Sequence, residues 1–137
     1  MGTEKMKPAE QVDLTGARVL VVEDEYYIAD DLKRTLSGAG ATVVGPAPTL
    51  AAAQDLLDAS QFDCAVIDLN LQGESAVPLA DKLVEQRCSF AIATGYGSPA
   101  VPDRLKSVPR IEKPFDPPAL LRLVGQLSCA KSGSPGA

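Results

Sequence analysis

Five short apolar runs, rich in β-branched residues, recur along the chain and are separated by segments with helical spacing. The runs cover residues 17–22, 41–45, 62–69, 90–94 and 110–113. Strands that alternate with helices in this way predict an α/β fold, with a parallel sheet covered by helices on both faces. The runs are continuously apolar, which is typical of strands buried on both faces. A length of 137 residues favours one domain.

Four segments have the spacing or the start signals of helices. In the first, residues 28–36 carry an apolar side chain every four positions, and glycines follow. The other three are expected to begin after the N-cap residues Thr49, Ser75 and Asp116. Pro117 then stands at the first helical position of the last helix, where its missing N–H is tolerated.

Polar side chains stand where four of the predicted strands end. Ligands of open parallel sheets bind beyond the carboxyl ends of the strands, so these residues are the candidate site. They are Glu23 and Asp24 after the first strand, Asp68 at the end of the third, Thr94 at the end of the fourth, and Lys113 with Pro114 at the end of the fifth.

Acidic side chains that converge on one sheet edge repel one another, and a divalent cation relieves that repulsion. Hard oxygen ligands suit Mg²⁺, which keeps several waters and takes few protein groups. We therefore predict a Mg²⁺ site with Asp24 and Asp68 as direct ligands and Glu23 acting directly or through water. The main-chain carbonyl of Asn70 is expected to be a further ligand.

A cation beside a lysine and a hydroxyl suits phosphoryl transfer, which needs positioning and neutralisation of charge on the transferring group. Asp68 is the candidate nucleophile and would form an acyl phosphate, while Lys113 and Thr94 would bind the phosphoryl oxygens. Each residue alone has an ordinary structural reading, such as a turn aspartate or a solvated lysine. The prediction depends on their conjunction, each at the carboxyl end of its own strand.

Composition argues against several other functions. The net charge is −5 and no basic cluster occurs, which argues against binding nucleic acid. The chain has no histidine, which excludes Ser-His and Cys-His catalysis and a phosphohistidine carrier, and its three cysteines lack metal-type spacing. The N-terminus lacks a signal-peptide core and no apolar run could span a bilayer, so we expect a cytoplasmic protein without membrane contact.

The stretches "VLVVEDE", "AVIDLNLQG", "ATGYG" and "IEKPF" resemble the receiver domain of two-component response regulators over about residues 17–128. The resemblance implies a flavodoxin-like (CheY-like) sheet with strand order 2-1-3-4-5. It also implies that Asp68 accepts a phosphoryl group from a histidine kinase or a histidine phosphotransfer protein. Glu23 and Asp24 would form the acidic pocket, Thr94 and Lys113 would read the phosphate, and the Lys113–Pro114 peptide bond would be cis.

"ATGYG" further resembles the FAT GUY subgroup of mostly stand-alone receivers, although Ile92 replaces the subgroup's leading phenylalanine. Many receivers place an aromatic switch residue three positions before the lysine, where this chain has Arg110. Tyr96 could supply the moving ring instead, and the alternative is a tyrosine half buried over the loop. By resemblance, Asn70 and Tyr96 should influence the lifetime of the phosphate.

The segment before the fifth strand contains Pro99, Pro102 and Pro109, which disfavour a regular helix. We expect a short or irregular fourth helix, at most a turn or so at 103–107, that is mobile until phosphorylation orders it.

We expect a flexible lead-in at 1–16, a receiver domain at 17–128 and a disordered tail at 129–137. This small polar tail cannot fold into an output domain, which favours a stand-alone receiver that signals through a protein effector and turns over no external substrate. A receiver cut from a hybrid kinase or transcription factor is an alternative. A phosphatase of the haloacid dehalogenase type would need an acid where Asn70 stands. A nucleotide cofactor would need glycines where "EDEYY" follows the first strand.

Overall fold

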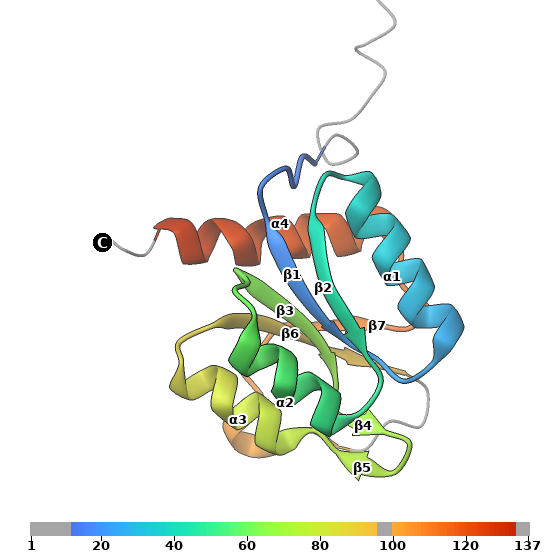
Figure 1. Ribbon diagram of the computed structural model, residues 1–137, viewed down its shortest axis with the longest axis vertical. Helices are drawn as coiled ribbons and strands as arrows, with labels where there is room; N and C mark the ends of the chain where they lie inside the picture. Colours follow the sequence, from blue (N-terminus) through green and yellow to red (C-terminus); the bar gives the residue numbers. More distant parts are fainter. Residues whose placement is uncertain (1–11, 96–99, 134–137) are drawn as a thin grey trace, which may run out of the picture.

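A five-stranded parallel sheet forms the centre of the molecule (Figure 1). The computed structural model describes residues 12–95 and 100–133. The strands of this sheet are β1 (Arg18–Val22), β2 (Thr42–Ala47), β3 (Cys64–Asp68), β6 (Ser89–Thr94) and β7 (Arg110–Glu112). Their order is β2-β1-β3-β6-β7, which is the predicted order 2-1-3-4-5 for the five main strands, so the flavodoxin-like fold class is confirmed.

Helices cover both faces of the sheet, and a hydrophobic cluster lies under each layer (Figure 1). The helices are α1 (Tyr26–Gly38), α2 (Leu50–Ala59), α3 (Val77–Glu85) and α4 (Pro117–Gly133). Side chains of α2 and α3 belong to one cluster, and side chains of α1 and α4 belong to the other. Neighbouring residues of a strand point to opposite faces, so Ile67 joins the first cluster and Val66 the second.

The predicted starts of α2 and α4 are confirmed, and that of α3 is wrong by one residue. Thr49 is the N-cap of α2, and its hydroxyl accepts a hydrogen bond from the Ala52 N–H at 3.1 Å. α4 begins at Pro117, as predicted. α3 begins after Ala76, which makes no side-chain cap bond, instead of after Ser75.

A short antiparallel hairpin that the sequence did not predict explains this shift. It lies between β3 and α3 and consists of β4 (Asn70–Leu71) and β5 (Glu74–Ser75) (Figure 1). Ser75 therefore pairs with Asn70 in the hairpin, although its hydroxyl still accepts a hydrogen bond from the first helical N–H, that of Val77, at 3.1 Å.

Within residues 100–109, the part of the segment before β7 that the structure describes, the only helix is the 3-10 helix η3 (Asp103–Leu105), as the prolines predicted. Val101 and Leu105, at 7% and 1% exposure, anchor it in the same cluster as α2 and α3. This anchoring argues against the expected mobility at 100–109. Residues 96–99, the other part of that expectation, lie outside the described residues.

Both ends of the folded part differ from the predicted domain limits. Leu14 is 2% exposed, and its N–H donates to the Ala39 carbonyl at 2.7 Å, so residues 12–16 pack against the domain and are not part of a flexible lead-in. α4 continues to Gly133, beyond the predicted tail boundary at 129. The expectations for 1–11 and 134–137 lie outside the described residues. Over the described residues, no helix combines the length and apolarity needed to cross a membrane.

Candidate functional site

The parallel register brings the predicted site residues to one edge of the sheet. Val22 of β1 is paired with Ile67 of β3, so the next residues, Glu23 and Asp68, lie side by side at the same height of the sheet. Asp68 is in turn paired with Ala93, the residue before Thr94. Lys113 follows β7, and its N–H donates to the Thr94 carbonyl at 2.7 Å. Four chain segments that are distant in sequence thus meet at their carboxyl ends.

Lys113 joins the two buried acids of this edge. Its Nζ lies 2.7 Å from Asp68 Oδ2 and 3.0 Å from Glu23 Oε1. The side chains of Lys113 and Asp68 are 11% exposed and that of Glu23 is 0% exposed, so water screens these contacts little. The Lys113–Pro114 peptide bond is cis, the isomer that the resemblance implied.

The second oxygen of each buried acid is held by a main-chain N–H. Asn70 N–H donates to Asp68 Oδ1 at 2.8 Å, and Glu25 N–H donates to Glu23 Oε2 at 3.1 Å. Within the described residues, no buried side-chain nitrogen or oxygen lacks a partner. The carboxylate of Asp68 is therefore fixed on both oxygens.

Burial and charge act against each other at Glu23 and Lys113. Burial raises the pKa of Glu23, and the hydrogen bond from Lys113 only partly offsets this effect. Burial also disfavours the charged form of Lys113, but its hydrogen bonds to Asp68 and Glu23 outweigh burial and raise the pKa of the ammonium group. Lys113 therefore stays positively charged at neutral pH beside the two acids.

Glu23, Asp24 and Asp68 also form a group of oxygens suited to a metal ion. One carboxylate oxygen from each lies within 4.8 Å of the others. Three hard oxygen donors with one half-buried member open to solvent, Asp24, fit the preference of Mg²⁺ for a few carboxylates plus water. Both oxygens of Glu23 and both oxygens of Asp68 already accept hydrogen bonds within the protein, so these bonds do not separate the two acids, and the assignment of Asp24 and Asp68 as direct ligands stays a prediction. The metal role of the Asn70 carbonyl stays a prediction.

The remaining predicted residues are only partly accounted for. Thr94 ends β6 and is half buried, and the role of its hydroxyl stays a prediction. Tyr96 lies outside the described residues, so its switch role is untested. The side-chain oxygen of Asn70 accepts a hydrogen bond from Gly73 N–H at 2.9 Å, a contact that the sequence analysis missed. The glycine at 73 was the available signal, because Gly favours hairpin turns.

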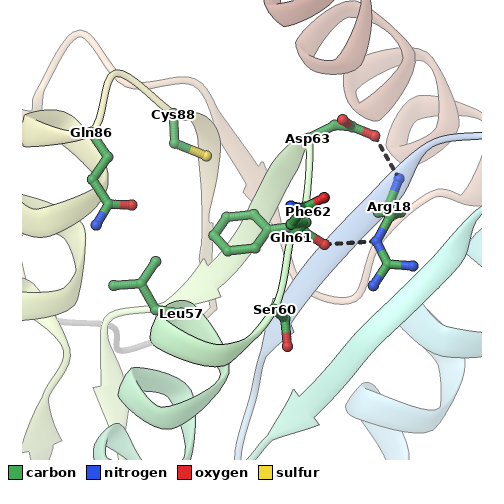
Figure 2. Close-up of a pocket in the computed structure, with 8 residues that line it drawn as sticks. All are labelled: Arg18, Leu57, Ser60, Gln61, Phe62, Asp63, Gln86 and Cys88. Carbon is green, nitrogen blue, oxygen red and sulfur yellow. Dashed lines mark hydrogen bonds between the residues drawn. The ribbon is translucent and has the colours of Figure 1, made fainter.

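A separate hollow of about 370 Å³ opens at the opposite edge of the sheet, where the strands begin (Figure 2). Phe62 points toward the side where Leu57, Gln86 and Cys88 lie, whereas Arg18 lies on the other side of the chain at 60–63. Arg18 donates from Nε to the Gln61 carbonyl at 2.7 Å and from its main-chain N–H to Asp63 Oδ2 at 2.8 Å. These bonds fasten the start of β1 to the chain entering β3, which is a structural role.

Solved structures with the same architecture include proteins from several bacteria. SdrG from Sphingomonas melonis Fr1 is 32% identical, with a TM-score of 0.71 over 85% of this chain and 96% of that one. PhyR from Brucella abortus is 24% identical, with a TM-score of 0.75 over 91% of this chain and 53% of that one. The anti-anti-sigma factor PhyR from Bartonella quintana is also 24% identical, with a TM-score of 0.75 over 97% and 58%. The chain therefore spans little more than half of either PhyR.

No curated protein matches the chain. The family model described as the response regulator receiver domain matches residues 19–124, which is most of the sequence. This range contains every strand of the five-stranded sheet except the first residue of β1, and it contains all the residues of the candidate site. The chain belongs to the family of response regulator receiver domains.

Proposed function

We propose that this protein is a single-domain response regulator that accepts a phosphoryl group on Asp68 in a Mg²⁺-dependent reaction. The observation that carries the proposal is the contact of Lys113 Nζ with Asp68 Oδ2 at 2.7 Å, beside the acids Glu23 and Asp24. A buried carboxylate with a fixed cation next to it combines a nucleophile with a group that neutralises an incoming phosphoryl oxygen.

The transfer needs little from the protein besides position and charge. A carboxylate oxygen of Asp68 would form the new bond to phosphorus while the bond from phosphorus to the donor's imidazole nitrogen breaks, and the imidazole would leave with its electron pair and take up a proton. Lys113 would move its hydrogen bond to a phosphoryl oxygen, and the Thr94 hydroxyl would donate to another. The donor imidazole must come from outside these 137 residues, which contain no histidine.

A Mg²⁺ ion held by Asp24, Asp68 and the Asn70 carbonyl, with Glu23 contributing through water, would supply further neutralisation of the phosphoryl charge. The donor set of three carboxylates within 4.8 Å of one another supports this assignment. Turnover of an external substrate is not expected, because the acyl phosphate forms on the protein itself.

The proposed partners are a histidine kinase or histidine phosphotransfer protein as donor and a protein effector as the recipient of the signal. The likeness to SdrG, at 32% identity over 96% of that chain, supports the stand-alone type. The assignment to the FAT GUY subgroup rests on the resemblance of "ATGYG" alone. The name of the Bartonella protein, an anti-anti-sigma factor, suggests a regulator of sigma factors as one class of effector.

Mass spectrometry after incubation with acetyl phosphate and Mg²⁺ tests the proposal. We expect one phosphoryl adduct on the wild type and none on Asp68→Asn. Asp63→Asn is the matched control. Asp63 lies just before the first residue of β3, at the end of the strand opposite Asp68, so this substitution should leave the adduct unchanged. An adduct that persists in Asp68→Asn, or that requires Asp63, would refute the assignment. A phosphotransfer screen against histidine kinases would then identify the donor.

A further inference from the structure

The chain that follows Asp68 is a closed hairpin with a strained turn. Asn70 pairs with Ser75 and Leu71 pairs with Glu74, and the turn between them consists of Gln72 and Gly73. Both turn residues have left-handed backbones, with φ of 55° and 89°. Two successive residues of this kind make the tight turn that matches the twist of a two-residue hairpin loop.

A buried side chain and a main-chain hydrogen bond hold this hairpin against the domain. Leu71 is 3% exposed and belongs to the cluster under α2 and α3. Ala76 N–H donates to the Leu69 carbonyl at 2.8 Å, which closes the base of the hairpin. Across the turn, Gly73 N–H donates to the side-chain oxygen of Asn70 at 2.9 Å. The turn thus engages the side-chain oxygen of Asn70, and the strand pairing holds its main chain.

The main chain of Asn70 in turn holds Asp68, because its N–H donates to Asp68 Oδ1 at 2.8 Å. We propose that Gly73 is a positioning residue: by bonding the Asn70 side chain, it keeps the Asn70 main chain in register with Asp68 and so sets the orientation of the carboxylate that receives phosphate. The inference rests on the proposed function. It assigns the Asn70 side chain to the turn instead of to direct contact with the reacting groups.

Two substitutions at position 70 separate these roles. Asn70→Ala removes the acceptor for Gly73 N–H, while Asn70→Ser offers a shorter side chain whose hydroxyl can accept the same bond, although more weakly. Neither variant keeps the amide. We expect Asn70→Ala to slow phosphorylation of Asp68 by acetyl phosphate about fivefold, the factor for one hydrogen bond of about 1 kcal/mol, and Asn70→Ser to stay within about twofold of wild type.

Gly73 has a matched control at the other edge of the sheet. Gly16 has φ of 88°, and at both glycines an added Cβ would meet no atom within 4 Å. A β-branched residue strains both backbones without an immediate clash. We expect Gly73→Val to slow phosphorylation about tenfold, the factor for 1.4 kcal/mol of left-handed strain, and Gly16→Val to lose similar stability with an unchanged rate.

Amide hydrogen exchange and Mg²⁺ titration calorimetry of the same four variants, in the absence of a phosphoryl donor, measure the order of the site and its affinity for Mg²⁺. Faster exchange of the residue-70 amide in Asn70→Ala and Gly73→Val, with restoration in Asn70→Ser, would support the proposal. Equal phosphorylation rates in Asn70→Ala and Asn70→Ser would overturn the proposal. It would also be overturned if Gly73→Val were phosphorylated as fast as the wild type although the amides of its hairpin exchange freely. If the wild type took no phosphate, the proposed function would fail, and residue-70 exchange would still decide the positioning role.

Discussion

At the scale of single residues, the stability of the site depends on Lys113. Its ammonium group is the only cation within hydrogen-bond distance of Glu23 and Asp68 among the described residues. Removing one member of a buried group of charges lowers the free energy of unfolding by far more than the whole group contributes to it, because the remaining charge stays buried without a partner.

Lys113→Met should therefore lower the unfolding free energy of the metal-free protein by about 3–5 kcal/mol at neutral pH. Added Mg²⁺ should recover part of this loss, because a divalent cation also neutralises the acids. Urea denaturation with and without Mg²⁺ measures both effects. Arg34→Gln, which removes the exposed pair with Asp30, is the control and should cost at most about 0.5 kcal/mol. A metal-free Lys113→Met protein as stable as this control would contradict the prediction.

The identity of the site residues could be read from the sequence because each one ends its own strand. The bonds between them could not. Lys113 and Glu23 are 90 positions apart, and only the sheet order makes them neighbours. Gly73 signals a turn, but the bond between Asn70 and Gly73 could not be predicted from this signal alone, because the hairpin pairing also depends on Leu71 reaching the core.

At the scale of elements, the segment that contains η3 is held to α3 by an ion pair between Arg104 and Asp81 that includes two hydrogen bonds. Arg104 donates from Nε and from a terminal nitrogen to the two oxygens of Asp81, at 3.0 and 2.9 Å. The hydrogen bonds from Arg104 lower the pKa of Asp81. Together with the buried Leu105, this pair fixes η3 without a regular helix.

Arg104→Gln should free the Asp81 carboxyl and loosen this segment. We expect the pKa of Asp81, followed by NMR, to lie below 3.8 in the wild type and to rise toward that ordinary value in the variant. Because the folded-state pKa is lowered, the pair stabilises the protein above pH 3.8, and this contribution is lost as the pH falls through the lowered value.

Amide exchange at 100–109 should be faster in Arg104→Gln at neutral pH. Lys106→Gln is the matched control, since Lys106 pairs only with Asp103 of the same segment, at 3.2 Å, and does not reach α3. If both variants exchanged equally fast, the tie to α3 would have no special effect.

The start of α2 could be predicted because a single local signal, the Thr49 hydroxyl, decides it. The start of α3 could not. Ser75 has the right chemistry for a cap, but the preceding hairpin uses this residue as a strand and displaces the helix. The lack of a regular helix at 100–109 could be predicted, because a proline in a helix interior costs about 3 kcal/mol and this stretch carries Pro102 and Pro109.

At the scale of the whole molecule, the sheet divides the core into two clusters that share no side chain. The two helical layers followed from the alternation of strands and helices, since buried parallel strands need cover on both faces. The strand order did not follow from this alternation and came from the resemblance to receiver domains. The limits of the domain did not follow. Leu14 joins the core from outside the predicted strand, through an apolar contact that no local pattern announces.

Substitutions on opposite faces should therefore act independently, whereas neighbours on one face should not. Ile67 and Ile92 are paired in register in one cluster, and Ile111 belongs to the other. Each Ile→Val change should cost about 0.5–1.5 kcal/mol. The costs at Ile67 and Ile111 should add within about 0.5 kcal/mol, and those at Ile67 and Ile92 should deviate from additivity by more. Urea denaturation of the three single and two double variants tests this, and equal coupling in both pairs would argue against two separate cores.

The grip on both oxygens of Asp68 has a consequence for how the reaction responds to temperature. A nucleophile already immobilised before its donor arrives gives up little rotational freedom on the way to the transition state. The activation entropy of phosphorylation by a small donor, obtained from an Eyring plot, should then become more unfavourable in Asn70→Ala, where the grip is looser. If the slower rate of Asn70→Ala is entropic, the ratio of the wild-type rate to the variant rate should stay the same on warming. A ratio that falls on warming would show that an enthalpy difference separates the two proteins.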